Sequence, residues 1–554
     1  MINPAHILAT GNNLNNIIMI FFIILTFAAL ASIINNQKKD AFIILLVILL
    51  FGVLFHVFFG YFWIGQHSSF AWGSDDAYIS YRYASNLAQG HGLVYNVGER
   101  VEGYTNFLFV LIMSLGEKLF GDAGAYPFAC VFNFLIIIML FVVFYKYLKE
   151  KYGETNALLG GLMFVLCPPL WLWAASGTEA VLVLFIQTII YIFLQKAILG
   201  GRKKDLFILC GLMVLSVLVR ADGFILPLVV IAYLLIKKEW RLSYYCFVSA
   251  FLPLAIYVTW RWSYYGYLFP NTYYAKVSGP ILLRVNYALN NLPRDIWIYL
   301  SIFGAGLIWR LKDKLSGRVD KLAGISFIYF YVSTSLLYWL YIGGDFYQER
   351  FLIVFFPLGI IILIDYLSKI RRSGIIEIMV LLVAIIQLMP LYSPLIDQRF
   401  AYQYPKYDNW ITLGKFIKTK YQGKVIAGGA GGKIPYFSGL KAIDSLGLND
   451  KYIAHKDVGS IKKFTPGHNK FDPDYVFSRK PDLIIDWIDR DSLDLVWGIN
   501  RRDYLNNGYE IRYLLNTNKI SLEENIIDVK HFSLERIEQL IKRGFRFGVL
   551  ERND

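Results

Sequence analysis

The sequence predicts a polytopic α-helical membrane protein that carries a C-terminal α/β domain. Hydrophobic residues make up 56% of the 554 residues and the mean hydropathy is +0.47, which is unusual for a soluble globular protein. After Leu391 the apolar runs end and a Tyr- and Pro-rich linker begins. We therefore expect a membrane domain at residues 1–391 and a soluble domain at residues 392–554, long enough to have its own core.

Twelve apolar runs are long enough to span a bilayer or nearly so. They lie at residues 17–34, 41–59, 126–145, 156–173, 178–195, 205–219, 224–236, 246–260, 295–309, 322–341, 351–364 and 374–391. Basic residues occupy every second loop, which the positive-inside rule makes cytoplasmic. Both termini and the other loops are then expected outside, at residues 60–125, 174–177, 220–223, 261–294 and 342–350.

One further apolar run, Tyr104 to Phe120, would break this alternation if it crossed the membrane. It would place the basic segment Lys146 to Lys151 outside. We therefore predict an interfacial or re-entrant helix, which can lie at membrane depth where it packs against protein or lines a cavity.

Hydrophobic patterning predicts several elements of the soluble domain. Strands are expected at residues 424–427, 481–487 and 545–550, and helices at residues 409–421 and 533–543.

The segment Gly428 to Lys433 resembles a phosphate-binding loop, because glycines after a strand let backbone N–H groups approach a phosphate. Ala427 replaces the first glycine of that pattern, Ile434 stands where Ser or Thr is required, and no helix signal follows. A tight turn after the strand is the favoured interpretation.

Composition excludes several classes of function. The net charge is +14, but Lys and Arg cluster in short loops between apolar runs, so no nucleic-acid partner is expected. The four cysteines lie in apolar segments without CxxC spacing, which indicates neither a zinc site nor a disulfide framework. HExxH, GxSxG and EF-hand motifs are absent.

Asp75 and Asp76 form an acidic pair in the first large outer loop. A charge near hydrocarbon is expensive unless it is hydrated, paired or metal-bound, so the pair is a candidate site. The alternative is structural: Asp75 would cap a helix that begins at Ala77, with Asp76 in its first turn.

Further acidic residues lie in turns on the same predicted face, namely Glu102, Glu179, Asp222 and Asp345, with the cations Arg220, Lys276 and Arg350 among them. Carboxylates can act as a general base or hold a divalent cation such as Mg²⁺, Mn²⁺ or Ca²⁺, here at Asp75 and Asp76. Arg and Lys suit a donor phosphate. The alternative is local pairing, for instance of Arg220 with Asp222 or of Glu349 with Arg350.

A membrane enzyme whose site faces away from the cytoplasm lacks nucleotide-activated substrates, so its donor is expected in the lipid with a phosphate as leaving group. Carboxylates would deprotonate an acceptor hydroxyl while cations stabilise the departing phosphate. This chemistry describes glycosyl transfer from a polyprenyl-phosphate sugar.

An ordered set of short motifs resembles the GT-C class of lipid-phosphate-sugar-dependent glycosyltransferases, and within it the mycobacterial-type terminal arabinofuranosyltransferases and their bacterial relatives. The motifs begin at Asp75, Gly90, Val101, Ser176, Arg220, Tyr264, Pro270, Gly343, Ile434, Asp444, Pro466 and Arg479. The resemblance covers roughly residues 60 to 550 and implies a GT-C-like bundle with interfacial helices. Arg220-Ala221-Asp222-Gly223 and Tyr347-Gln348-Glu349-Arg350 depart from the family pattern, so arabinose is not assumed.

The resemblance also implies roles for residues. Inversion at the anomeric carbon would take place at the outer face of a bacterial cytoplasmic membrane, with Asp75 or Asp76 as catalytic base and the other binding acceptor or metal. Binding of the sugar or the acceptor, an envelope glycan or glycolipid, is expected from Tyr78, Arg82, Glu102, Tyr104, Asn106, Glu179, Asp222, Asn271, Asp345 and His468.

Two alternatives remain. An enzyme of the same class could glycosylate lipid A or protein. A transporter or flippase is disfavoured, because its ionisable groups would lie near the bilayer midplane, often in repeated halves. In the soluble domain Tyr436, His468 and Trp487 are candidates for sugar stacking, although such aromatic residues more often belong to a core.

Overall fold

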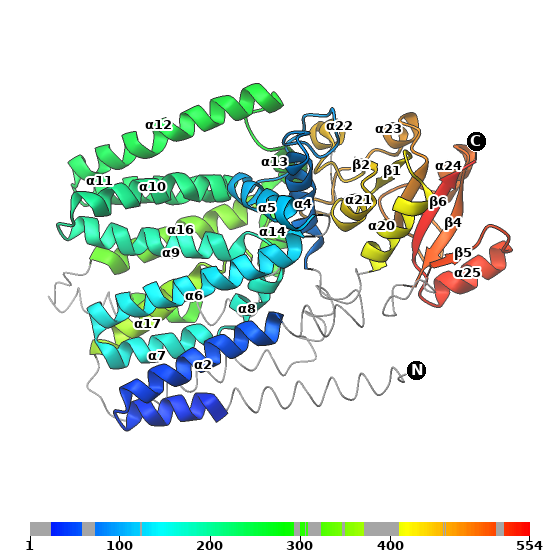
Figure 1. Ribbon diagram of the computed structural model, residues 1–554. Coiled ribbons are helices and arrows are strands. Elements are labelled where there is room, and N and C mark those ends of the chain that lie inside the picture. Colours follow the sequence, from blue (N-terminus) through cyan, green and yellow to red (C-terminus); the bar gives the residue numbers. More distant parts are fainter. Residues whose placement is uncertain are drawn as a thin grey trace.

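The computed structural model describes residues 24–57, 73–121, 124–292, 300–304, 306–308, 323–345, 350–369, 409–457, 459, 461, 463–516 and 526–553. A bundle of long helices lies beside a smaller domain built around a β-sheet (Figure 1). The short helices α4 (Asp75–Ala88) and α13 (Asn271–Lys276) lie where the two meet. The predicted boundary at residues 391 and 392 lies outside the described residues.

Most of the predicted apolar runs form helices near their expected positions. These are residues 24–34, α2 (Lys38–Val57), α6 (Ala125–Tyr152), α7 (Glu154–Val165), α8 (Pro168–Ala175), α9 (Ala180–Ile198), α10 (Lys203–Val219), η3 (Ala221–Phe224), α11 (Ile225–Ile236), α12 (Trp240–Tyr265), α16 (Ala323–Ile342) and α17 (Phe355–Lys369). The predicted run at 374–391 lies outside the described residues, and those at 17–34, 41–59 and 295–309 are described only in part.

Within the described ranges, four helices are long and apolar enough to cross a membrane: α6, α9, α12 and α16. A bent pair, α7 with α8, raises this number to five if it forms one span. The chain is therefore a multi-helical membrane protein, and the twelve spans with their orientation stay predictions.

The single run predicted at residues 156–173 is wrong in one respect, because it consists of two helices bent by 59°. Pro168 and Pro169 lack the backbone N–H that would continue α7, so a new helix begins there. In α7, Gly160 lets the helix approach α6 closely, since a Cβ there would lie 2.4 Å from Leu148 Cδ1.

The apolar run predicted to be interfacial or re-entrant forms α5 (Phe107–Phe120), which packs against α4, α6 and α10. Its buried face includes Phe109, Val110 and Met113. The helix is as expected, and its depth in the membrane stays a prediction. Two short helices, α13 and α14 (Ile281–Asn290), follow α12.

The C-terminal domain contains a six-stranded sheet in the order β2-β1-β3-β6-β4-β5. Its strands are β1 (Val425–Gly428), β2 (Lys441–Asp444), β3 (Leu483–Trp487), β4 (Tyr509–Leu515), β5 (Ile526–Asp528) and β6 (Phe547–Arg552). β2, β1 and β3 are parallel, and the remaining pairings are antiparallel. The three predicted strands correspond to β1, β3 and β6.

The described residues of this domain form six helices: α20 (Asn409–Lys420), α21 (Lys433–Ser438), α22 (Lys451–His455), α23 (Pro473–Ser478), α24 (Arg501–Asn506) and α25 (Leu534–Lys542). α20 and α25 correspond to the predicted helices. The expectation that no helix follows the glycine-rich segment is wrong, because α21 begins at Lys433. Its six residues are too few to show a helical period.

The two parts of the chain are joined through Arg82, a buried residue of α4. Its guanidinium donates to the carbonyl oxygens of Pro435 and Leu440, which lie in α21 and just after it, and also to Tyr95 O and Asn96 Oδ1. A buried cation with all these acceptors holds the C-terminal domain against α4. The glycine-rich segment is thereby brought next to the start of α4.

Candidate active site

The first turn of α4 is fixed by the residues that precede it. Gly73 has φ of 75°, and a Cβ there would lie 2.5 Å from the Tyr126 ring, so the backbone requires glycine. Ser74 N donates to Ser176 O at 3.0 Å. Ser74 is the N-cap residue of α4, and its side chain makes no capping hydrogen bond. Because the helix begins at Asp75 and not at Ala77, the alternative that Asp75 only caps a helix is wrong. Asp75 and Asp76 both belong to the first turn.

Asp75 points toward the C-terminal domain. Its carboxylate accepts hydrogen bonds from Lys433 N at 2.7 Å and from Gly432 N at 3.2 Å. Burial raises the pKa of Asp75 to about 6, although Lys433 and the two N–H groups oppose this shift. The glycine-rich segment therefore binds an anion, and that anion is a side chain of the helix bundle.

Asp76 points toward a second set of partners. Its Oδ2 accepts from Arg350 Nη1 at 2.9 Å, and Arg350 also makes a bidentate pair with Asp345, with both distances at 2.9 Å. Burial acts to raise the pKa of Asp76, but Arg350 and Lys276 outweigh it and hold the pKa below its usual value. The Asp76 side chain is 29% exposed, whereas that of Arg350 is 8% exposed. Asp76 therefore borders accessible space.

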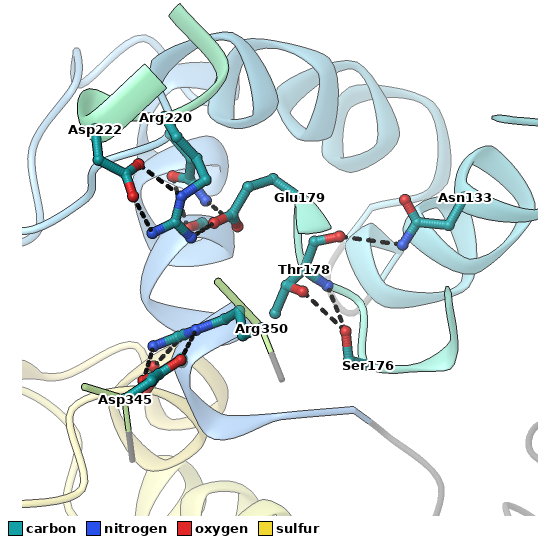
Figure 2. A network of polar contacts seen from close by, with 11 residues as sticks. Asn133, Ser176, Thr178, Glu179, Arg220, Asp222, Asp345 and Arg350 are labelled. Carbon is teal, nitrogen blue, oxygen red and sulfur yellow. Dashed lines mark hydrogen bonds and ion pairs between the residues drawn. The ribbon is translucent and has the colours of Figure 1, made fainter. Parts of the chain in front are cut away.

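Arg220 organises a neighbouring network (Figure 2). It donates to Glu179 Oε1 at 2.8 Å and pairs with Asp222 at 2.8 Å, which confirms the local Arg220–Asp222 pairing. Glu179 also accepts from Asn106. The Phe351 ring lies 4.2 Å from the Arg220 guanidinium and 5.6 Å from that of Arg350, so this ring connects the two networks. The other predicted local pair includes Glu349, which lies outside the described residues.

The Glu179 turn is held by uncharged partners that Figure 2 also shows. Asn133 Nδ2 donates to Thr178 O at 3.1 Å, and the hydroxyls of Ser176 and Thr178 lie 2.8 Å apart. These contacts fix the carboxylate that Arg220 binds.

Two further groups face Asp76. Within the described residues Lys276 makes no hydrogen bond or ion pair, yet Asp76 and Asp345 act on it electrostatically; burial and Arg350 lower its pKa. His468 is near enough for Asp76 and Lys276 to act on it, and burial lowers its pKa. Its ring lies 4.9 Å from that of Trp497. The sequence interpretation missed Trp497, which no motif contains.

Several residues predicted to bind sugar or acceptor have structural partners instead. Arg82 holds the domains together as described. Tyr78 is buried among the rings of Tyr81, Tyr436 and Phe437.

Three others, Glu102, Tyr104 and Asn271, lie where the helix bundle meets the C-terminal domain. Glu102 faces Arg261 at 3.6 Å, and burial raises its pKa to about 8. Tyr104 contacts the Tyr265 hydroxyl, and the Asn271 amide donates to carbonyl groups of the C-terminal domain. Among the predicted stacking residues, Tyr436 and Trp487 also pack in apolar surroundings, Trp487 against Phe547.

The residues do not fit a site for a divalent cation in the form expected. Asp75 is bound by N–H groups and Asp76 by Arg350, so both carboxylates already have positive partners. Hard cations take six or more oxygen ligands. Among the described residues, no three His, Cys, Asp or Glu side chains gather in a way that could hold a metal.

Comparisons with known proteins match two parts of the chain to family models. The family model of dolichyl-phosphate-mannose-protein mannosyltransferases matches residues 106–262, and a domain of unknown function matches residues 397–529. The chain is 28% identical over 338 residues to the terminal β-(1→2)-arabinofuranosyltransferase of Mycobacterium tuberculosis, covering 53% of this chain and 54% of that protein. It is 27% identical over 353 residues to the Corynebacterium glutamicum protein of that name, covering 54% and 48%. The chain thus matches about half the length of these relatives.

Two solved structures share the fold. ArnT from Cupriavidus metallidurans bound to undecaprenyl phosphate has a TM-score of 0.51 at 11% identity, covering 86% of this chain and 93% of that one. The Archaeoglobus fulgidus oligosaccharyltransferase has a TM-score of 0.51 at 11% identity, covering 88% and 75%. The chain therefore shares the fold of these two structures, and its residues 106–262 are similar to a glycosyltransferase family model. Over about half of its length it is similar to the terminal β-(1→2)-arabinofuranosyltransferases, which confirms the predicted resemblance.

Proposed function

We propose that the protein is an inverting glycosyltransferase that moves a sugar from a polyprenyl-phosphate donor to an envelope glycan or glycolipid. The observation that carries the proposal is the split environment of the acidic pair. Successive residues of a helix project about 100° apart. Asp75 meets main-chain N–H groups of the C-terminal domain, and Asp76 meets Arg350 of the bundle with Lys276 nearby.

This split suits an inverting displacement, in which the acceptor attacks the face of the sugar opposite the leaving phosphate. The Lys276 ammonium and the Arg350 guanidinium would bind the donor phosphate and stabilise the negative charge that develops on it. Asp75 would take the proton of the acceptor hydroxyl. As the hydroxyl oxygen bonds to the anomeric carbon, the bond from that carbon to the phosphate oxygen breaks, and polyprenyl phosphate leaves with both electrons.

Asp76 has a different role in this proposal. Its pairing with Arg350 and its lowered pKa make it a poor proton acceptor, so it would orient the guanidinium. Glu179, Asp222 and Asp345 neutralise the two arginines in the same way. These residues would limit how tightly the phosphate is held, which favours release of the product lipid.

The test replaces each acid separately, Asp75→Asn and Asp76→Asn, and measures sugar transfer in proteoliposomes with purified polyprenyl-phosphate sugars of pentose and hexose type. We expect Asp75→Asn to lose more than about 100-fold in kcat, within the usual contribution of a general base. Glu154→Gln is the control, because this carboxylate forms a surface pair with Lys149. Full transfer by a folded Asp75→Asn protein would contradict the role of Asp75.

The acceptor and the orientation are part of the proposal. Mass spectrometry of envelope glycans, lipid A and proteins from cells with and without the gene would show which molecule loses a sugar. For orientation, an impermeant maleimide applied to intact cells or spheroplasts should label Lys530→Cys in the C-terminal domain and spare Lys203→Cys at the start of α10. Both positions are exposed, and three of the four native cysteines are buried.

A further inference from the structure

We infer that the glycine-rich loop of the C-terminal domain, Gly428 to Lys433, is a positioning element that orients the Asp75 carboxylate, so that this domain completes the active site. The inference rests on the proposed function for the role of Asp75. It concerns residues that contact no reacting atom, and it explains why a soluble domain is attached to a membrane-embedded transferase.

Among the described residues, the loop supplies both hydrogen bonds to the Asp75 carboxylate. Gly432 N and Lys433 N each bind a different carboxylate oxygen, so the plane of the group is fixed as well as its position. Both donors lie more than 350 residues further along the chain than their acceptor. The orientation of this carboxylate therefore depends on docking of the C-terminal domain.

The loop is shaped to approach α4 this closely. A Cβ on Gly432 would lie 2.0 Å from the Asp75 carbonyl oxygen, far inside contact distance. At the other end of the loop, a Cβ on Gly428 would lie 2.3 Å from Ile485 O of the neighbouring strand. Between them, Gly431 O accepts a hydrogen bond from Tyr95 at 2.7 Å. The loop is thus confined on the sheet side, on the bundle side and in the middle.

A second contact prevents the loop from sliding along α4. Arg82 lies two turns after Asp75 and donates to Pro435 O and Leu440 O, which bracket the end of α21. Asn96 adds hydrogen bonds to Ala442 in β2. With Asp75 at one end and Arg82 at the other, the relative position of α4 and the loop is determined at two points.

The N–H groups of Gly432 and Lys433 affect the protonation of Asp75. They favour the charged form of Asp75 and so oppose the effect of burial. If the loop moves away while the site remains shielded, the carboxyl keeps its proton to higher pH and its plane is no longer fixed. Transfer should then need a higher pH and should also be slower at its plateau.

The experiment uses Gly432→Ala in the full-length protein, with Gly211→Ala as the matched control, because a Cβ at Gly211 meets no atom within 4 Å. We measure the pH dependence of kcat and the KM for the polyprenyl-phosphate donor. Loss of a hydrogen bond to a charged group should move the acidic limb up by about one pH unit and lower the plateau roughly 10-fold. The donor KM should remain close to that of the wild type, since Arg350 and Lys276 are untouched.

A second variant covers the case in which Gly432→Ala does not fold. Tyr95→Phe removes only the hydroxyl that binds Gly431 O, and the protonated-carboxyl band of Asp75, assigned by its absence in Asp75→Asn, can be titrated by infrared spectroscopy. An upward shift of that titration supports the inference. An unchanged acidic limb and an unchanged titration, in variants that retain the fold, would overturn it. Activity in Asp75→Asn would instead remove the proposed base, so the two failures are distinguishable.

Discussion

Replacement of Lys276 by Met tests which cation meets the donor phosphate. Arg220 and Arg350 each bind two carboxylates, whereas Lys276 has no hydrogen bond or ion pair within the described residues. Its ammonium lies close enough to Asp76, Asp345 and Arg350 for electrostatic interaction with all three. Lys276 is therefore the group whose charge is available to a ligand.

The expected effect on binding follows from the loss of one charge-assisted contact. A hydrogen bond to a charged group contributes about 1.5–3 kcal/mol, which corresponds to roughly 10- to 160-fold in affinity. Methionine keeps nearly the length and volume of the lysine side chain, so packing should change little. Because burial and Arg350 lower the pKa of Lys276, removal of its charge should not destabilise the fold.

The comparison variant is Arg350→Met, which should behave differently. It leaves the carboxylates of Asp76 and Asp345 without their shared partner, and breaking a buried pair in this way costs about 3–5 kcal/mol. Arg350→Met should therefore lose both stability and donor affinity, whereas Lys276→Met should lose affinity alone.

The assay is binding of a short-chain, water-soluble polyprenyl phosphate by isothermal titration in detergent, together with thermal unfolding of each variant. A competition series at increasing salt checks that the lost interaction is electrostatic. Wild-type affinity in Lys276→Met would refute the assignment of this residue to the phosphate. Equal loss of stability in the two variants would refute the claim that Lys276 makes no hydrogen bond or ion pair with the described residues.

Further predictions concern the titration of Asp75, the Arg82 contact and Trp497. Transfer should rise with pH to a plateau above about 6, the value to which burial raises the pKa of Asp75, and this limb should vanish in Asp75→Asn. Because that pKa is raised from its usual 3.8, the folded protein holds the Asp75 proton more tightly than the unfolded chain does. The contribution of Asp75 to stability should therefore decrease as the pH rises from 3.8 to about 6. The melting temperature should fall over this pH range, and Asp75→Asn should abolish the fall. Arg82→Met should lower the melting temperature and expose the contact between α4 and the C-terminal domain to limited proteolysis, because it leaves Pro435 O and Leu440 O without their buried donor. The control is Arg202→Met, which should do neither, because the Arg202 side chain is 84% exposed. Trp497→Ala should raise the acceptor KM and leave the donor KM unchanged, because Trp497 reaches the site through His468 from the C-terminal domain; a change in the donor KM alone would contradict this placement.

The helices of the bundle could be predicted from the sequence because apolar length is a local property. The acidic pair at Asp75 and Asp76 was found for the same reason, since two charges beside an apolar run need no partner to be conspicuous. The helix break at Pro168 shows where length alone misleads, because a continuous apolar run says nothing about a missing backbone N–H.

The partners of the acidic pair could not be predicted, because they are distant in sequence. Asp76 and Arg350 are 274 residues apart, and Arg82 and Pro435 are 353 residues apart. Arg82 shares a motif with the acids and was therefore assigned to the substrate, although its donors are used within the protein. Strand β4 was not predicted, although apolar and charged residues alternate from Tyr509 to Tyr513, a pattern typical of a strand.

The glycine-rich loop shows how a correct chemical interpretation can be attached to the wrong partner. Its glycines leave the backbone N–H groups of Gly432 and Lys433 accessible to an anion, as in a phosphate-binding loop, and the missing Ser or Thr rightly argues against a nucleotide. A carboxylate presents two acceptor oxygens much as a phosphate does, so the same backbone geometry can bind Asp75. Two adjacent acids would repel each other if both faced one cavity, but the first turn of α4 directs them apart, and each meets positive partners from a different part of the chain. Because one set belongs to the bundle and the other to the C-terminal domain, the pair is assembled only when the two parts dock.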